Sequence, residues 1–149
     1  MPAPPREVFP FFADARNLET LTPPWLRFSV RTPAPIEMQA GARIEYRIRV
    51  HGIPLRWESV ISAWEPPDRF VDEQRKGPYR RWVHTHRFFE ERGGTRLVDE
   101  VNFELFVGWL MAPLVTRDLR GIFTYRHHVL HRLFSTQSPA GEPTIQIFS

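Results

Sequence analysis

Residues 43–50 read Arg-Ile-Glu-Tyr-Arg-Ile-Arg-Val, and charged side chains alternate along them with apolar or aromatic ones without a break. Because successive side chains of a β-strand point to opposite faces, this alternation predicts a strand with one buried face and one face in solvent. Four further segments have strand character, at residues 55–64, 69–75, 80–90 and 95–107, and short turns rich in glycine, proline or charged residues separate them. The sequence from residue 43 to residue 107 therefore predicts an antiparallel meander of five strands with one apolar face.

The period of the apolar residues changes after the meander. Between residues 110 and 134 they recur at spacings of three and four, which is typical of a long amphipathic helix. Gly121 interrupts this helix, and we expect it to mark close packing against the sheet. Two short helices are expected before the meander, at residues 6–14 and 17–21, and Pro23 and Pro24 end the second. The prediction is an α+β fold in which a curved antiparallel sheet wraps around a long C-terminal helix.

The composition suits one domain and excludes several kinds of site. With 149 residues, of which 42% are hydrophobic, the chain is long enough to bury one core. It has no cysteine, so disulfides and thiolate metal sites are excluded. The net charge of +3 comes from basic residues scattered among acidic ones, so nucleic acid is not an expected partner. No segment reads as a secretion signal or a membrane span, and we expect a cytoplasmic protein.

Short motifs along the chain resemble those of a known superfamily. They are Asn17-Leu18 with Thr22-Pro23-Pro24-Trp25, Asp72-Glu73-Gln74 with Gly77-Pro78-Tyr79, Trp82-Val-His84-Thr-His86-Arg-Phe88, Gly93-Gly94-Thr95, and Ile122-Phe123-Thr-Tyr125-Arg126. With the order of elements, they are similar to the SRPBCC, or START-like, helix-grip superfamily of lipid-transfer domains, birch-pollen-allergen proteins and polyketide cyclase/dehydrases, and most of all to a bacterial ligand-binding branch. The resemblance covers residues 4–134 and implies the helix-grip fold. It leaves the function open, because binders, carriers and enzymes share this scaffold.

The two ends of the chain differ from the superfamily pattern. The usual strand before the first helix has no counterpart, since only residues 1–3 precede that helix. An open sheet edge invites pairing, and residues 144–148 read as a short strand after a linker at 135–143. We expect this strand to occupy the vacant edge, either within one chain or between the chains of a swapped homodimer, and a disordered tail is the alternative. Residues 1–149 are thus expected to form a single helix-grip domain.

Two histidines are the main candidates for chemistry. Strand alternation places His84 and His86 on the same inward face as Trp82 and Phe88. Buried imidazoles need hydrogen-bond partners, and a structural network with Asp72, Gln74 or Asp99 is the favoured interpretation. A metal site completed by Asp99 or Glu73 is less favoured, and we expect no metal. The cyclase resemblance implies a third reading, in which His84 or His86 is a general acid or base oriented by Asp99.

The helix carries three more histidines, and the turns carry a glycine pair. His127, His128 and His131 include a pair at i,i+4, but arginines surround them, and a solvated basic face is favoured over a metal site. Gly93-Gly94 lacks the lysine and the following helix of a phosphate-binding loop, so no cofactor is expected.

Aromatic side chains on the inward faces predict a ligand cavity under the helix. Rings that do not meet would line a space in which a few polar groups orient a ligand. The expected ligand-binding residues are Tyr46, Trp57, Trp82, His84, His86, Phe88, Phe103 and Phe123. The leading hypothesis is that the protein binds or carries a small hydrophobic or amphipathic molecule. The alternatives are a cyclase- or dehydratase-like enzyme that uses the pocket histidines, and a partner-regulating domain with a vestigial pocket.

Overall fold

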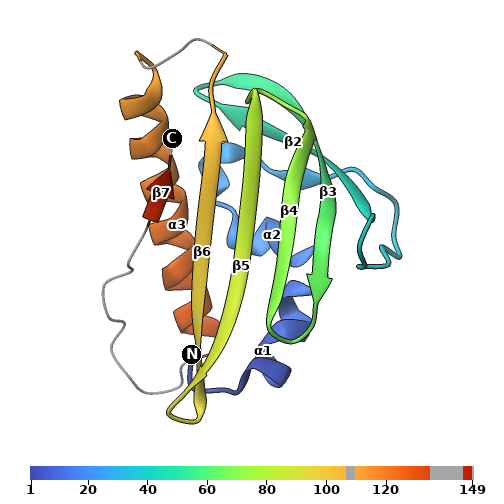
Figure 1. The fold of residues 1–149 in the computed structure, drawn as a ribbon. Helices are drawn as coiled ribbons and strands as arrows, with labels where there is room; N and C mark the ends of the chain where they lie inside the picture. The colour runs from blue at the N-terminus through green and yellow to red at the C-terminus, as the bar shows by residue number, and fades with distance from the viewer. Residues whose placement is uncertain (107–109, 135–145, 149) are drawn as a thin grey trace.

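The structure, a computed structural model, describes residues 1–106, 110–134 and 146–148. A curved sheet covers the helices, with the long helix α3 running along β6 (Figure 1). The elements are α1 (Pro5–Phe12), α2 (Asn17–Leu21), the 3-10 turn η1 (Pro24–Leu26), β1 (Ser29–Val30), β2 (Arg43–Val50), β3 (Ile53–Glu65), β4 (Arg69–Lys76), β5 (Arg81–Glu91), β6 (Gly94–Glu104), α3 (Ala112–Phe134) and β7 (Gln146–Phe148). This is the predicted helix-grip fold, and the prediction of fold class is confirmed.

The sheet follows the chain order from β1 to β7. Pairing is antiparallel from β1 to β6, and the alternation at 43–50 appears as β2, where Ile44 is buried and the arginines are exposed. β3 is longer than predicted at both ends. It starts earlier because His51 and Gly52 adopt positive φ angles of 48° and 81° and reverse the chain within two residues, and it ends later because Glu65 still pairs with Arg69 of β4. β1 was not predicted, because its two residues are too few to show a period.

β7 lies at the far edge of the sheet. It pairs in parallel with β6, with Gln146 opposite Glu100 and Phe148 opposite Asn102. The predicted linker at 135–143 lies outside the described residues, as do Thr144, Ile145 and the last residue of the strand expected to end at Val107. Among the described residues, no helix is both long and apolar enough to cross a membrane.

The N-terminal residues form hydrogen bonds with the hairpin formed by β5 and β6. The Met1 ammonium donates to the Thr95 carbonyl oxygen at 2.8 Å, and the Thr95 amide donates to the Met1 carbonyl oxygen at 2.7 Å. The Thr95 hydroxyl donates to the Ala3 carbonyl oxygen at 2.6 Å. These bonds place α1 across the end of the sheet, where Pro5 at the first helical position needs no hydrogen-bond partner for its nitrogen.

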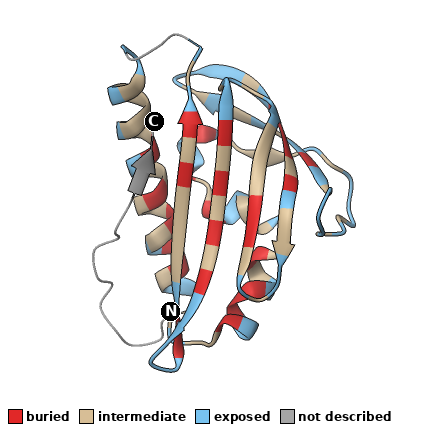
Figure 2. Cartoon of the chain, viewed as in Figure 1, coloured by how far each residue is buried: buried red, intermediate tan, exposed pale blue. Residues whose placement is uncertain are grey.

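Buried residues recur along the strands of the sheet and on the helices α1 and α3 (Figure 2). At the α1 end, Phe9 and Phe12 pack against Phe70 and Phe88 with ring centroids 5.0 to 6.1 Å apart. Aromatic rings fill the space between the sheet and the helices at this end, and Val129 and Leu130 of α3 belong to the same cluster. The space for a ligand therefore lies further along the sheet.

The expectation for Gly121 is wrong. A Cβ atom built at this position would meet no atom within 4 Å, and the residue is exposed. Close packing against the sheet therefore does not require a glycine at this point of α3.

Candidate functional site

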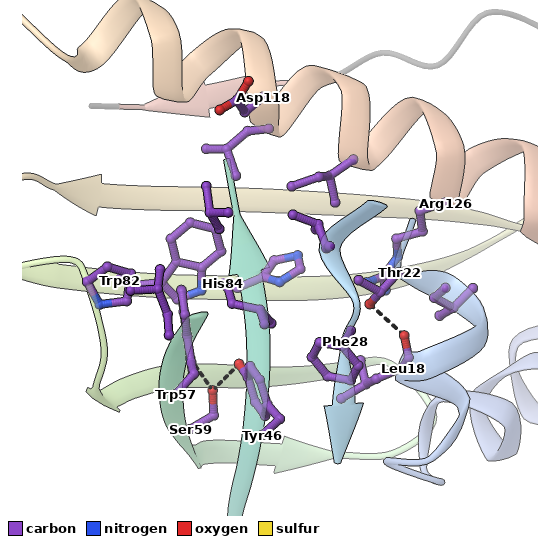
Figure 3. A pocket seen from close by; sticks show the side chains of 18 of the residues that line it. Leu18, Thr22, Phe28, Tyr46, Trp57, Ser59, Trp82, His84, Asp118 and Arg126 are labelled. Carbon is purple, nitrogen blue, oxygen red and sulfur yellow. Dashed lines mark hydrogen bonds between the residues drawn. The ribbon is translucent and has the colours of Figure 1, made fainter. Parts of the chain in front are cut away.

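A cavity of about 680 Å³ lies between the inner face of the sheet and α3. It falls in the size range of small-molecule sites, which is about 300–1,000 Å³. Its lining comes from the sheet strands, α3 and the segment around α2 and η1, and most of these side chains are aliphatic or aromatic (Figure 3). The sheet and the helix thus enclose a space with largely apolar walls.

The structure brings six of the eight predicted ligand-binding residues together at this cavity. They are Tyr46, Trp57, Trp82, His84, His86 and Phe123. The lining does not include Phe88, which packs into the aromatic cluster under α1, or Phe103, which lies against Trp82 and Tyr79. Strand alternation predicts which rings face inward. It does not predict which of these rings are covered by other rings and so kept out of the cavity lining.

A hydroxyl cluster forms part of the wall on β2 and β3. Tyr46 stacks on Trp57 across the two strands, with ring centroids 5.8 Å apart. The Trp57 indole donates to Ser59 Oγ at 3.1 Å, and the Tyr46 hydroxyl lies 3.0 Å from the same oxygen (Figure 3). Burial, followed by the negative charge of Asp72, raises the pKa of Tyr46 well above its ordinary value. The phenol therefore stays neutral and can donate a hydrogen bond.

Four titratable side chains meet on the inner face of the three strands β4, β5 and β6. Asp72 pairs in register with His84, and His86 pairs in register with Asp99. Register partners project to the same side of a sheet, as do His84 and His86, which stand two residues apart on β5, so all four side chains lie on one face. His84 and His86 are 7% and 2% exposed, so both imidazoles must find partners inside the protein. We call the group formed by these four side chains and Arg126 of α3 the polar cluster.

Each imidazole of the polar cluster lies between the two carboxylates. Asp99 Oδ1 is 3.0 Å from His84 Nε2 and 2.7 Å from His86 Nδ1. Asp72 Oδ2 is 3.0 Å from His86 Nε2 and 3.5 Å from His84 Nδ1. The third partner considered from sequence, Gln74, bonds instead to the Tyr79 backbone.

Arg126 closes the cluster from the helix side. Its Nε is 3.4 Å from Asp99 Oδ2, and its Nη2 is 3.3 Å from His86 Nδ1. Arg126 was not predicted to lie at the site, although its position in the sequence carries a signal. The residue stands three positions after Phe123 and seven after Leu119, on the stripe of α3 that is buried, so it was a candidate for a buried charge.

The electrostatics of the cluster favour ionised carboxylates. Burial alone would raise the pKa of Asp99, but the Arg126 charge and hydrogen bonds from both histidines hold it well below its ordinary value. Burial opposes ionisation of Asp72 too, yet the hydrogen bond from His86 and the charge of His84 keep its pKa lowered. Burial, followed by the charge of His86, lowers the pKa of His84. Two carboxylates and one guanidinium leave one negative charge, which a proton or another cation can neutralise.

Two partly exposed side chains line the cavity where the β2–β3 turn meets α3. They are His51 and Asp118, whose side chains are 53% and 30% exposed. Burial, followed by the charge of Asp118, raises the pKa of Tyr79, another lining residue, to about 12. None of these three residues was predicted to line the cavity, since turn and helix residues meet there only in the folded chain.

The same fold occurs in solved structures of low sequence identity. Protein Ms6760 from Mycobacterium smegmatis is 19% identical with a TM-score of 0.66, over 91% of this chain and 86% of that chain. A nucleoside-diphosphate sugar epimerase from Corynebacterium glutamicum is 24% identical with a TM-score of 0.64, over 89% of this chain and 27% of the epimerase. Ara h 8.0201 is 18% identical with a TM-score of 0.57, over 86% of this chain and 90% of that chain. These likenesses show the fold alone.

The family is shown by the sequence itself. No curated protein matches the chain. Residues 1–124 match the family described as polyketide cyclase / dehydrase and lipid transport, so the match spans most of the chain and includes α1 and all six antiparallel strands. The predicted resemblance is confirmed, and the chain belongs to the polyketide cyclase / dehydrase and lipid transport family.

Proposed function

We propose that this protein binds a small, largely apolar molecule with an oxygen-bearing end in the cavity between the sheet and α3. The observation that carries the proposal is a cavity of about 680 Å³ whose walls are mostly apolar and whose polar groups are few and clustered. A binding site of this kind gains affinity from burying apolar surface and gains orientation from a small number of polar contacts.

The polar groups define which end of the ligand lies deepest. His84, His86 and Asp72 line the cavity on the sheet side, and the hydroxyl cluster of Tyr46 and Ser59 lines it on the neighbouring strands. Burying a ligand oxygen without a partner would cost affinity, so a carbonyl, hydroxyl or carboxyl group is expected to face these side chains. The remaining apolar part of the ligand then contacts rings such as Trp57, Trp82 and Phe123.

Binding can be tested with a variant that fills the cavity. Protein purified without added ligand is examined by native mass spectrometry, and carboxylic acids of increasing chain length and multi-ring phenols are titrated by calorimetry. Ile48→Trp adds a large side chain to the lining and is expected to abolish saturable binding. Phe89→Trp adds the same ring on the exposed side of β5 and serves as the matched control. Equal affinities in the two variants would contradict a ligand site in the cavity.

A second candidate function is a cyclase- or dehydratase-like reaction on the bound molecule. It is favoured by one arrangement, in which His84 faces the cavity while its Nε2 is held 3.0 Å from Asp99 Oδ1. An imidazole oriented by a carboxylate is a common general acid or base, and Asp99 would act as its positioning residue. In His84→Gln, ligand binding that persists while turnover of a carbonyl substrate disappears would support catalysis. The absence of turnover in the unsubstituted protein would leave the binding function alone.

A further inference from the structure

Three potential ligand atoms converge on the cavity side of the polar cluster. Asp72 Oδ2, His84 Nδ1 and His86 Nε2 belong to a group whose ligand atoms all lie within 4.8 Å of one another. The carboxylate oxygen is 3.0 Å from the His86 nitrogen and 3.5 Å from the His84 nitrogen. Both histidines are buried, so these atoms do not simply face bulk water.

Asp99 can fix both imidazoles in the tautomer that a metal ion requires. Its Oδ1 faces the other nitrogen of each ring, His84 Nε2 at 3.0 Å and His86 Nδ1 at 2.7 Å. An ionised carboxylate only accepts hydrogen bonds, so each ring can donate an N–H to Asp99. At His86 Nδ1 the 2.7 Å contact with Asp99 is shorter than the 3.3 Å contact with the Arg126 guanidinium, which would need a lone pair on that nitrogen. A metal ion would replace the proton that His86 Nε2 shares with Asp72, and the opposite nitrogens of both rings would then present lone pairs towards Asp72. A carboxylate that orients metal-binding histidines in this way is a common feature of metal sites.

The distances from Asp72 Oδ2 to the two histidine nitrogens suit adjacent positions around one ion. Nitrogen and oxygen ligands bind a divalent transition metal at about 2.0–2.2 Å, which places neighbouring ligands about 3.0–3.5 Å apart at tetrahedral or octahedral angles. The 3.0 and 3.5 Å separations of Asp72 Oδ2 from the two nitrogens lie in this range. Two histidines at i,i+2 on β5 and an aspartate on the paired strand β4 can therefore supply three ligands to one ion.

The remaining coordination positions would face the cavity. Asp72, His84 and His86 line the cavity, whereas Asp99 lies behind them and is not in the lining. Three protein ligands with open positions are typical of metal sites that bind a further ligand, in contrast to closed structural sites with four protein ligands. An oxygen of a molecule in the cavity could occupy such a position.

Arg126 affects which further ligand fits. It lies 3.3 Å from His86 Nδ1 and 3.4 Å from Asp99 Oδ2, on the side of the rings turned away from Asp72. A divalent ion, Arg126 and the two carboxylates together leave one positive charge. A buried site with this charge favours an anionic oxygen in the open position, such as a carboxylate, an enolate or hydroxide.

We propose that Asp72, His84 and His86 bind one divalent transition-metal ion at the wall of the cavity, with Asp99 orienting both imidazoles. This goes beyond ligand binding, and it replaces the expectation of no metal that the sequence favoured. Two imidazoles and one carboxylate suit Zn²⁺, Fe²⁺, Co²⁺ and related ions rather than Ca²⁺ or Mg²⁺.

The test uses the full chain stripped of metal and titrated with Co²⁺ and Zn²⁺ in the absence of any organic ligand. Calorimetry is expected to give one ion per chain, and bound Co²⁺ is expected to show visible absorption bands of a site with nitrogen donors. Asp72→Asn and His84→Gln should abolish this binding, and Asp99→Asn should weaken it about 10- to 100-fold while leaving the three ligands in place. His131→Gln removes one member of the histidine pair on the helix surface and should leave binding unchanged.

Two results would overturn the metal site. One is binding that survives His84→Gln but disappears with His131→Gln, because the ion would then lie on the helix surface. The other is an X-ray absorption spectrum of the unsubstituted protein loaded with Zn²⁺ that shows oxygen donors without imidazole nitrogen. The X-ray absorption measurement uses the unsubstituted protein, so it tests the site even if a substituted variant does not fold. Because no organic molecule is added, failure here leaves the proposal of ligand binding intact.

Discussion

His51 in the β2–β3 turn and Asp118 on α3 are joined by a hydrogen bond of 2.6 Å between Nε2 and Oδ2, and both residues line the cavity. The bond connects residues 67 positions apart in the sequence. It joins the strand turn to the helix at partly exposed positions of the lining, so we expect it to influence how quickly a ligand enters and leaves.

Asp118→Ala is therefore predicted to accelerate ligand dissociation several-fold. The cost in unfolding free energy should stay within about 1 kcal/mol, because the pair is partly exposed and such pairs contribute little to stability. Stopped-flow fluorescence measures the rates, and urea unfolding measures stability. Glu91→Ala breaks an exposed pair with Arg96 that includes no cavity-lining residue and is the control. A dissociation rate equal to that of the control would show that the bond does not restrain ligand exit.

Asp99→Ala is predicted to destabilise the protein by about 3–5 kcal/mol. The substitution leaves the Arg126 guanidinium, 7% exposed, without its carboxylate, and an uncompensated buried charge is costly. Arg126→Met in the same chain should recover part of the loss. Chemical denaturation of both variants measures this, with Glu104→Ala at the exposed pairs with Arg80 and Arg81 as the comparison. Similar losses for Asp99→Ala and Glu104→Ala would contradict a tightly coupled cluster.

Tyrosine ionisation is predicted to destabilise the fold at high pH. The pKa of Tyr79 is raised to about 12, chiefly by burial, whereas an unfolded tyrosine ionises at about pH 10. The unfolded chain therefore loses its proton first, and stability falls as pH rises from about 10 towards 12. Phenolate absorbance at increasing pH should show a late-titrating group that Tyr79→Phe removes. Tyr79→Phe should also be less sensitive to alkali, and an unchanged alkaline transition would refute this assignment.

Gly121→Ala is predicted to raise the unfolding free energy by up to about 1 kcal/mol. Alanine is the better helix former by this amount, and the added methyl group meets no atom within 4 Å. Thermal unfolding checks the change. Gly94→Ala provides a contrasting variant, because a Cβ there would overlap the Met1 carbonyl oxygen at the β6 edge and should lower the melting temperature. A lower melting temperature for Gly121→Ala would show that the helix needs the glycine after all.

Removal of residues 146–149 is predicted to promote self-association. The deletion exposes the backbone of Glu100, Val101 and Asn102 on the β7 side of β6, and unpaired strand edges pair with other chains. Light scattering after size-exclusion chromatography measures the association state, and thermal unfolding should show a lower melting temperature. If the shortened chain keeps both its size and its melting temperature, β7 does not protect the edge.

The sequence predicted the elements that have a clear period. Residues 43–50 alternate strictly, and β2 occupies the same residues. α3 starts at Ala112, close to the predicted start, because apolar spacing and Pro113 both indicate it. β1 has only two residues and gains its pairing from β2, so no local signal could reveal it.

The site was only partly predictable, because local patterns show which face a residue lies on but not which residues of other elements it meets. Alternation placed His84 and His86 inside, and both carboxylates considered as partners do contact them. Alternation says nothing about distances between strands, so the convergence of Asp72 with two imidazole nitrogens emerged only from the structure. Arg126 and Asp118 reach the site from α3, and the angle at which a helix crosses a sheet is set by packing of the whole domain.

Apart from Arg126, the polar cluster and the apolar wall opposite it come from different parts of the chain. Asp72, His84, His86 and Asp99 stand on adjacent strands whose backbone ladder fixes their separations, whereas much of the opposite wall consists of α3 side chains such as Leu119, Ile122 and Phe123. Substitutions on the helix can alter the size and shape of the accepted molecule without moving the groups that hold its polar end. Selectivity in this scaffold can therefore evolve, or be engineered, independently of the chemistry.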